Sequence, residues 1–221
     1  MSAGGSRPAL FEQLARVGKA LGNGNRLALI DLLAQGPRGV VELAREAGLN
    51  VTTTSAHLQT LRHAGLVAAD RDGTTIRYSL AGDDVAALYG QLLDVAATHV
   101  ADVDAAARRY LGPDDTEHIG REELLRRVSA GEAVVLDVRP ALEHAAGHIP
   151  GATSIPLDEL AERIDELPAD LEVVAYCRGA YCLFSHDAVR LLRSRGRRAV
   201  RLDDGIVEWR QAGKPLATTA G

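Results

Sequence analysis

Two cysteines lie five positions apart in one short stretch, Tyr176-Cys177-Arg178-Gly179-Ala180-Tyr181-Cys182, and they are the only cysteines of the 221-residue chain. The largely apolar run 171–175 predicts a buried strand before them, and the spacing of apolar residues in 183–194 predicts a helix after them. A cysteine between a strand and a helix lies where backbone N–H groups and the helix N-terminus stabilise a thiolate. The stretch therefore predicts a sulfur nucleophile at Cys177.

The composition, 46% hydrophobic and 25% charged over 221 residues, is that of a folded protein and predicts two ordinary domains. The chain has no apolar run of about 18 residues, and positions 1–5 lack the charged-then-apolar layout of a signal peptide. We therefore expect a cytoplasmic protein with no membrane partner. In that compartment two cysteines favour catalytic, redox or metal chemistry over a structural disulfide, with a free core cysteine as the ordinary alternative.

The first half of the chain reads as a series of helices followed by a hairpin. Apolar spacing predicts a first helix from Ser6 to Gly22 and further helices over 25–35, 40–47, 52–64 and 83–110. Strand-like runs at 66–70 and 75–80 flank Asp72-Gly73, a strong hairpin turn signal. Helices 40–47 and 52–64 around a glycine-containing turn predict a helix-turn-helix, and the hairpin would be its wing.

The segment 55–67, with Arg71-Asp72-Gly73 and Arg77-Tyr78-Ser79-Leu80, resembles the ArsR/SmtB family of winged-helix repressors. The resemblance implies a homodimer on a palindromic operator in double-stranded DNA, with helix 52–64 in the major groove and the wing at the minor groove. No acidic residue occurs between positions 47 and 69. The residues expected to contact bases or phosphates are Thr52, Thr53, Ser55, His57, Gln59, Arg62, Arg71 and Arg77.

Many members of that family bind an inducing metal, and the matching positions are absent from this chain. The third helix has no cysteine, and His99 and Asp102, one turn apart on helix 83–110, lack an upstream partner because Asp84 is followed by Val85 and Ala86. We therefore expect no metal site and no cofactor. The sensing function would lie in the second half.

Elements alternate after the turn-prone break at 112–118, which we take as a linker between domains 1–111 and 119–221. Helices are expected over 121–130, 157–166, 183–194 and 206–212, and strands over 133–138, 171–175 and 199–202. Apolar strands separated by helices predict an α/β domain with a parallel sheet. Sites in such sheets form at the carboxyl ends of strands, where Cys177 falls.

Four motifs of this half resemble a rhodanese domain: Leu136-Asp137-Val138-Arg139 with Glu143, Gly147-His148-Ile149-Pro150-Gly151-Ala152, the 177–182 loop, and Asp204-Gly205-Ile206-Val207-Glu208-Trp209 with Ala212-Gly213. The resemblance implies a sulfurtransferase fold in which Cys177 takes sulfane sulfur from thiosulfate or polysulfide as a persulfide and passes it to an acceptor. The loop residues expected to cradle the sulfur are Arg178, Gly179, Ala180, Tyr181 and Cys182, with Arg178 attracting an anionic donor. Asp137, Arg139, His148 and Trp209 are expected to be structural.

Phosphatases and arsenate reductases of related fold close a longer loop with an arginine six residues after the cysteine, and that position here is Leu183. The short loop favours sulfur over phosphate. Cys182 has two open interpretations: it attacks a persulfide on Cys177, or it is a small packing residue at a helix start. A metal held by Cys177, Cys182 and His186 is disfavoured, because Arg178 lies beside them.

The leading hypothesis is a DNA-binding transcriptional regulator, a repressor, with a mainly-α winged helix-turn-helix at its N-terminus and a rhodanese-like α/β domain that senses or transfers sulfane sulfur at Cys177. A second hypothesis is an active sulfurtransferase tethered to DNA without sulfur-dependent regulation. A third, an inactive rhodanese module used for protein contacts, is disfavoured by the intact Cys177.

Overall fold

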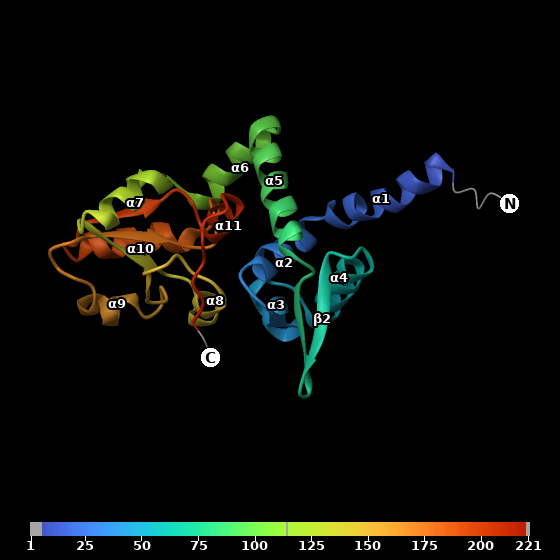
Figure 1. The fold of residues 1–221 in the computed structure, drawn as a ribbon, viewed down its shortest axis with the longest axis horizontal. Helices are drawn as coiled ribbons and strands as arrows, with labels where there is room; N and C mark the ends of the chain where they lie inside the picture. The colour runs from blue at the N-terminus through green and yellow to red at the C-terminus, as the bar shows by residue number, and fades with distance from the viewer. Residues whose placement is uncertain (1–5, 114, 220–221) are drawn as a thin grey trace. The chain divides into compact units, whose positions relative to one another are not determined.

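The computed structural model describes residues 6–113 and 115–219 and divides into two compact units, Met1–Tyr89 and Gly90–Gly221 (Figure 1). Positions 1–5 and Asp114 of the expected linker lie outside the described residues. The second unit begins well before the linker expected at 112–118. A contact between Gln211 and Asp94 helps to explain why residues before the linker belong to the second unit: Gln211 Nε2 lies 3.5 Å from Asp94 Oδ2.

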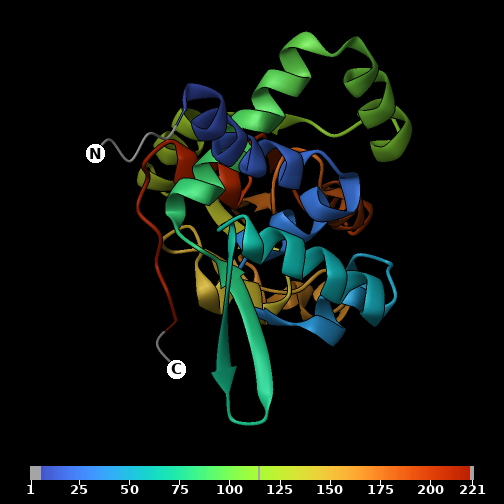
Figure 2. The same cartoon turned by 90° about the vertical axis from the view of Figure 1, so that its right-hand side faces the viewer.

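The first unit is a winged helix-turn-helix, as predicted. It consists of α1 (Arg7–Leu21), α2 (Gly24–Ala34), β1 (Arg38–Gly39), α3 (Val40–Glu46), α4 (Val51–His63), β2 (Val67–Asp72), β3 (Thr75–Leu80) and the start of α5 (Asp83–His99). The three strands form an antiparallel sheet in the order β1-β3-β2. Figure 2 shows β2 and β3 as a long hairpin, and its turn has Gly73 at φ 59°, a left-handed conformation that suits glycine.

Local chemistry fixes the start of α4. The side chain of Asn50 accepts a hydrogen bond of 2.8 Å from the backbone N–H of Thr53, which satisfies a donor of the first turn. Thr54, Leu58 and Leu61 follow at helical spacing and are buried. One face of α4 is thereby packed into the unit, and the opposite face is left to solvent.

The helix expected over 83–110 is wrong in one respect, because it is broken at Val100. The structure has α5 up to His99 and α6 over Ala101–Leu111, and Val100 takes extended angles of φ −111° and ψ 97°. Asp102 and Asp104 lie in the first turn of α6, where carboxylates favour a new helix N-terminus. His99 and Asp102 therefore do not share one continuous helix face.

The second unit adds a five-stranded parallel sheet to α6, confirming the α/β prediction. Its further elements are β4 (His118–Ile119), α7 (Arg121–Ser129), β5 (Ala133–Asp137), α8 (Ala141–Ala146), β6 (Thr153–Ser154), α9 (Leu160–Arg163), a 3-10 turn (Ile164–Glu166), β7 (Glu172–Tyr176), α10 (Leu183–Ser194), β8 (Ala199–Leu202) and α11 (Ile206–Gln211). The strand order is β4-β8-β7-β5-β6. Strand β7 therefore lies at the centre of the sheet.

Three short elements of this unit were not anticipated, and one expected helix is shorter than predicted. Strands β4 and β6 have two residues each, and α8 has six, which is below the length that hydrophobic periodicity detects. The helix expected over 157–166 is a four-residue α9 followed by the 3-10 turn.

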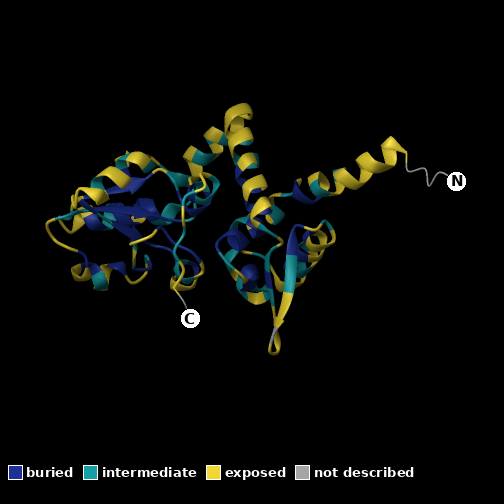
Figure 3. Cartoon of the chain, in the orientation of Figure 1, coloured by how far each residue is buried: buried dark blue, intermediate teal, exposed yellow. Residues whose placement is uncertain are grey.

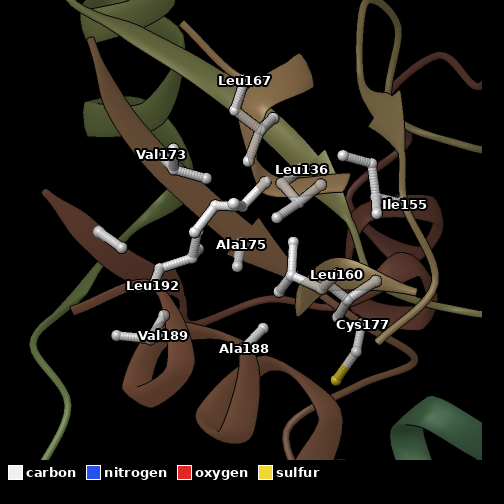
Figure 4. Packing of buried hydrophobic residues seen from close by; sticks show 13 residues of the cluster. Leu136, Ile155, Leu160, Leu167, Val173, Ala175, Cys177, Ala188, Val189 and Leu192 are labelled. Atoms are coloured by element: carbon white, nitrogen blue, oxygen red, sulfur yellow. The ribbon is translucent and has the colours of Figure 1, made fainter. Parts of the chain in front are cut away.

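The apolar core of this unit joins the sheet to α9 and α10. Figure 3 shows the central strands as buried, and the cluster on one sheet face includes Leu136, Ala175, Leu160, Ala188 and Leu192. Figure 4 shows Cys177 at one end of this cluster. Among the described residues, no helix combines the length and apolar character needed to cross a membrane.

Candidate functional site

Cys177 directly follows the central strand β7, and its side chain is enclosed rather than exposed. Its residue is 2% exposed, and its Sγ lies 3.4 Å from Ser185 Oγ and 3.6 Å from the carbonyl oxygen of Cys182. The loop turns back through a hydrogen bond of 3.0 Å from the Cys182 N–H to the Gly179 oxygen. The structure thus brings both cysteines and Ser185 of α10 together.

The two thiols differ in acidity because they interact with each other. Burial raises the pKa of the Cys177 thiol, and its hydrogen bond to Cys182 adds to this effect. The hydrogen bond from Cys177 lowers the pKa of Cys182, which also precedes the first turn of the 12-residue helix α10. In the reduced protein the Cys182 sulfur is therefore the first of the pair to ionise.

Residues of α11 hold the other side of the loop. A Cβ on Gly205 would lie 2.2 Å from the backbone nitrogen of Gly179, so the two backbones approach too closely for any other residue at position 205. The carboxylate of Glu208 accepts hydrogen bonds from the N–H of Ala180 at 3.2 Å and of Gly205 at 2.8 Å. Burial raises the pKa of Glu208, although these N–H donors act against the rise.

Glu208 was not expected to act on the loop. Its position beside Trp209 belongs to the last motif of the resemblance, which assigns Glu208 no contact. The residues around Glu208 do not indicate a hydrogen bond to Ala180, which is 28 positions away. In this structure the Ala180 N–H, expected to cradle the sulfur, donates to Glu208. The carboxylate therefore competes with a sulfur anion for this donor.

Replacing Glu208 by glutamine is expected to increase the reactivity of Cys177. Glutamine has one acceptor oxygen in place of two, so one of the N–H groups of Ala180 and Gly205 loses its acceptor. Loss of a nearby negative charge favours the thiolate by up to about tenfold, the equivalent of one pKa unit. The measurement is the rate of alkylation of Cys177 against pH, read by mass spectrometry. Glu166→Gln, an exposed acid of the same unit, is the control, and an unchanged or slower rate in Glu208→Gln would contradict the expectation.

The Arg178 side chain forms an ion pair with a carboxylate of the protein itself. Its Nε lies 3.0 Å and 3.1 Å from the two carboxylate oxygens of Glu143, whose side chain is 1% exposed. Its guanidinium carbon also lies 5.4 Å from the centre of the Phe184 ring. Its charge thus serves first to join the loop to α8, while a role toward an anionic donor stays a prediction.

A buried polar network lies on the other side of β7. Asp137 and Arg139 are both fully buried, and Asp137 Oδ2 accepts from Arg139 at 2.6 Å and from the Tyr176 hydroxyl at 2.7 Å. Burial alone would raise the pKa of Asp137, but hydrogen bonds from His144 and Arg139 lower it to about 2. Burial raises the pKa of the Tyr176 hydroxyl, and the neighbouring Asp137 carboxylate raises it further.

His148 and Trp209, the other two residues expected to be structural, are buried. His148 is 8% exposed, and its ring stacks on His144 with 3.7 Å between centroids. Trp209 is 2% exposed and donates from Nε1 to the Pro215 oxygen at 2.9 Å. None of these contacts involves the Cys177 sulfur.

The residues expected to bind DNA are distributed over α4 and the wing. Thr52, Gln59, Arg62 and Arg71 are exposed, and Thr53, Ser55, His57 and Arg77 are half-buried. The Arg77 guanidinium donates to the Pro37 oxygen at 2.5 Å, so it ties the wing to the turn before β1. Arg71 Nε donates to the Gly73 oxygen at 3.1 Å, which holds its side chain at the wing turn.

Over residues 6–113 and 115–219, the structure gathers no three side chains of histidine, cysteine, aspartate or glutamate in an arrangement that could hold a metal ion. His186, considered above with the two cysteines, has its Nδ1 3.4 Å from the Thr116 hydroxyl.

Comparisons with known proteins cover both units. Residues 120–212 match the rhodanese-like domain, and residues 23–69 match the bacterial regulatory proteins of the arsR family. The HTH-type transcriptional regulator Rv0324 of Mycobacterium tuberculosis is 55% identical over 211 residues, which cover 95% of this chain and 92% of that protein. A protein named sulfurtransferase from Allochromatium vinosum is 35% identical over 104 residues, or 47% of this chain and 96% of that one.

Among solved structures, the homodimeric winged helix-turn-helix domain of a possible ArsR-family regulator from Mycobacterium bovis is 50% identical. The match covers 45% of this chain and 94% of the chain in that structure, with a TM-score of 0.42. Because the full-length relative is matched over nearly all of both chains, and each unit matches its own family, the chain belongs to the ArsR family of DNA-binding transcriptional regulators and carries a C-terminal rhodanese-like domain.

Proposed function

We propose that this regulator is a homodimeric repressor that takes up sulfane sulfur on Cys177 and whose affinity for its operator depends on that sulfur. The observation that carries the proposal is the 177–182 loop, which places one enclosed thiol at the carboxyl end of the central strand and a second, more acidic thiol beside it. A persulfide formed here would have a partner sulfur within the same loop.

The loading step balances without an external oxidant. The Cys177 sulfur attacks the outer sulfur of thiosulfate, the S–S bond of thiosulfate breaks, and sulfite leaves with the electron pair. The proton of the Cys177 thiol passes to Cys182 or to solvent. A polysulfide would act in the same way, with a shorter polysulfide as the leaving group.

Contacts within the second unit support a connection from the loop to the long helices. Glu208 of α11 binds the loop backbone at Ala180, and Gln211 of the same helix contacts Asp94 of α5. A Cβ on Gly90 of α5 would lie 2.5 Å from the Gln211 side chain, so α5 and α11 pack closely here. Helix α5 begins in the first unit. A structural change in the loop is therefore linked, through α11 and α5, to the unit that contains the DNA-binding elements.

The dimer is supported by an apolar surface on α1. Leu10, Phe11 and Leu14 are 58%, 54% and 59% exposed, which is unusual for three large apolar side chains on adjacent helical turns. Val95 of α5 is likewise 56% exposed. A second copy of the chain that covers these side chains would remove them from water.

Replacing Arg71 by alanine is expected to weaken DNA binding for all sequences alike. A wing arginine that neutralises one phosphate contributes about one unit to the slope of log K against log salt, so the slope falls by about 1. The measurement is operator affinity by fluorescence anisotropy at several salt concentrations. Arg163→Ala, an arginine of the second unit, is the control, and an unchanged slope in Arg71→Ala would remove Arg71 from the interface.

The proposal as a whole is tested by gel-shift titration of operator DNA with and without polysulfide, for the wild type and Cys177→Ser. The expected result is a change in wild-type affinity on adding polysulfide, and no change in the variant. Equal affinity in all four cases would end the sensing role.

A second candidate is an active sulfurtransferase tethered to DNA. The relative named sulfurtransferase supports it, since its match spans 96% of that protein but 47% of this chain. Steady transfer of sulfur from thiosulfate to cyanide, with operator affinity unaffected by sulfur, would select this candidate.

A further inference from the structure

The loop that carries Cys177 has one positively charged side chain, and its charge is balanced within the protein. Among positions 177–182 the cationic residue is Arg178. Its guanidinium is paired with Glu143, whose side chain is 1% exposed, so the ion pair is largely shielded from water. A sulfur donor that approaches the loop therefore meets a cation that a carboxylate of the protein already neutralises.

A second carboxylate, that of Glu208, lies against the same loop. It accepts a hydrogen bond from the Ala180 N–H at 3.2 Å, and a Cβ on Gly179 would lie 3.0 Å from its Oε1. In the part of the chain that the structure describes, the partners of this carboxylate are backbone N–H groups rather than a cation. Such donors favour its ionised form. Two carboxylates and one guanidinium thus contact the loop, and the fixed charge of these three groups is negative.

The backbone of the loop has limited capacity to offset additional negative charge. The Ala180 N–H donates to the second carboxylate, and the Cys182 N–H donates to the Gly179 oxygen at 3.0 Å. The Cys177 Sγ lies 3.4 Å from the Ser185 hydroxyl, close to the start of the 12-residue helix α10. These surroundings support a single negative charge, that of a thiolate or a persulfide.

The charge of the donor decides how strongly it is repelled at this loop. Thiosulfate carries two negative charges, so its reaction with the Cys177 thiolate brings three negative charges together beside Glu208. A hydropolysulfide ion carries one, and an organic persulfide in its protonated form carries none. Because the Coulomb energy follows the product of the charges, Glu208 repels thiosulfate about twice as strongly as it repels a monoanion at the same distance.

We propose that Glu208 is a specificity-determining residue that makes Cys177 accept sulfane sulfur from donors with at most one negative charge, such as organic persulfides and hydropolysulfide ions, in preference to thiosulfate. This assignment rests on the proposed function and names its class of donor. The Cys177 thiolate attacks the outer sulfur of the organic persulfide, and the S–S bond of the persulfide breaks. The organic thiolate leaves with the electron pair, and the transferred sulfur keeps its proton, so no oxidant or reductant is needed.

The test compares two donors that react in the same way but differ in charge: thiosulfate, a dianion, and the methanethiosulfonate ion, a monoanion. In both cases the Cys177 thiolate attacks the outer sulfur, and either sulfite or methanesulfinate leaves. The rate constants for sulfur addition to Cys177 of the full-length protein are measured by mass spectrometry. In Glu208→Gln the ratio of the thiosulfate constant to the methanethiosulfonate constant is expected to rise by about tenfold. Any change in the acidity of Cys177 cancels in this ratio, because both donors react with the same thiolate.

Glu166→Gln, which removes an exposed acid of the same unit, is the matched control and should keep the wild-type ratio. A second variant covers the case in which Glu208→Gln does not fold. Ala180→Lys adds a positive charge at an exposed position of the loop and leaves Glu208 in place, so it should also raise the ratio, whereas Ala180→Gln should not.

An unchanged or lower ratio in Glu208→Gln would overturn the role of Glu208, and an equal ratio in Ala180→Lys and Ala180→Gln would do so if Glu208→Gln does not fold. In either case sulfur would still be added to Cys177, and the proposed function would stand. Failure of both donors to add sulfur to wild-type Cys177 would instead refute the proposed function, and the donor preference with it.

Discussion

Replacing Cys177 by serine is expected to eliminate sulfur loading of the chain, with transfer from thiosulfate reduced at least on the order of 10³-fold. A serine hydroxyl in the same enclosed site is a far weaker nucleophile and cannot hold a sulfane sulfur. The measurement is intact-protein mass spectrometry after exposure to thiosulfate or polysulfide, where the wild type gains the mass of added sulfur. Addition of sulfur to Cys177→Ser at the wild-type rate would contradict the assignment of the nucleophile.

Cys182→Ser is the informative partner of that variant. If Cys182 only packs at the start of α10, the variant should accumulate the same Cys177 persulfide as the wild type. If Cys182 attacks that persulfide, the wild type forms a disulfide between the two cysteines and releases hydrogen sulfide, whereas the variant stops at the persulfide. The masses of the two products differ, so one experiment separates the two interpretations that the sequence left open.

The acidity of the pair adds an independent readout. In the wild type the interaction between the sulfurs lowers the pKa of Cys182 and raises that of Cys177, so thiolate absorbance should rise in two separate steps with pH. Removing Cys182 takes away one cause of the raised Cys177 pKa but not its burial. The single remaining step in Cys182→Ser should therefore lie between the two wild-type steps.

The parts of the fold that the sequence predicted are those with a strong local signal. The strands β5 and β7 each contain a run of four apolar residues, and β8 has apolar residues on both sides of Arg201. Helix α10 has an apolar face of three turns. The break at Val100 was missed because neither proline nor glycine marks it, and the acids of the new first turn also suit an exposed helix face.

Within the candidate site, the limit of prediction was the contact between distant segments. The strand-to-helix position of Cys177 followed from neighbouring residues, and so did the length of the loop. The pairing of Arg178 with Glu143 joins residues 35 positions apart, and the bond of Glu208 to Ala180 joins residues 28 apart. Side-chain pairings over such separations depend on how the helices pack on the sheet, which residue spacing does not encode.

The buried pair below the loop leads to the largest expected effect on stability. Asp137→Ala leaves the Arg139 guanidinium without its carboxylate in a site that is fully buried, and breaking such a pair costs about 3–5 kcal/mol. The Tyr176 hydroxyl loses its acceptor in the same variant. We expect the free energy of unfolding of the second unit to fall by about that amount. Asp137→Leu combined with Arg139→Met should recover much of the loss, because neither member of this pair is then left as an unpaired buried charge.

Urea unfolding followed by fluorescence measures this change in one unit, since Trp209 is the only tryptophan of the chain and is buried in the rhodanese-like domain. Glu166→Gln, at an exposed ion pair, should leave the unfolding midpoint nearly unchanged. The pKa of Asp137 is about 2 in the folded protein and about 3.9 in an unfolded chain, so its contribution is present above pH 4 and is lost as the pH falls toward 2. Wild type and Asp137→Ala should therefore converge in stability over that acid range, and a constant difference between them down to pH 2 would show that the stabilisation does not come from the ionised carboxylate.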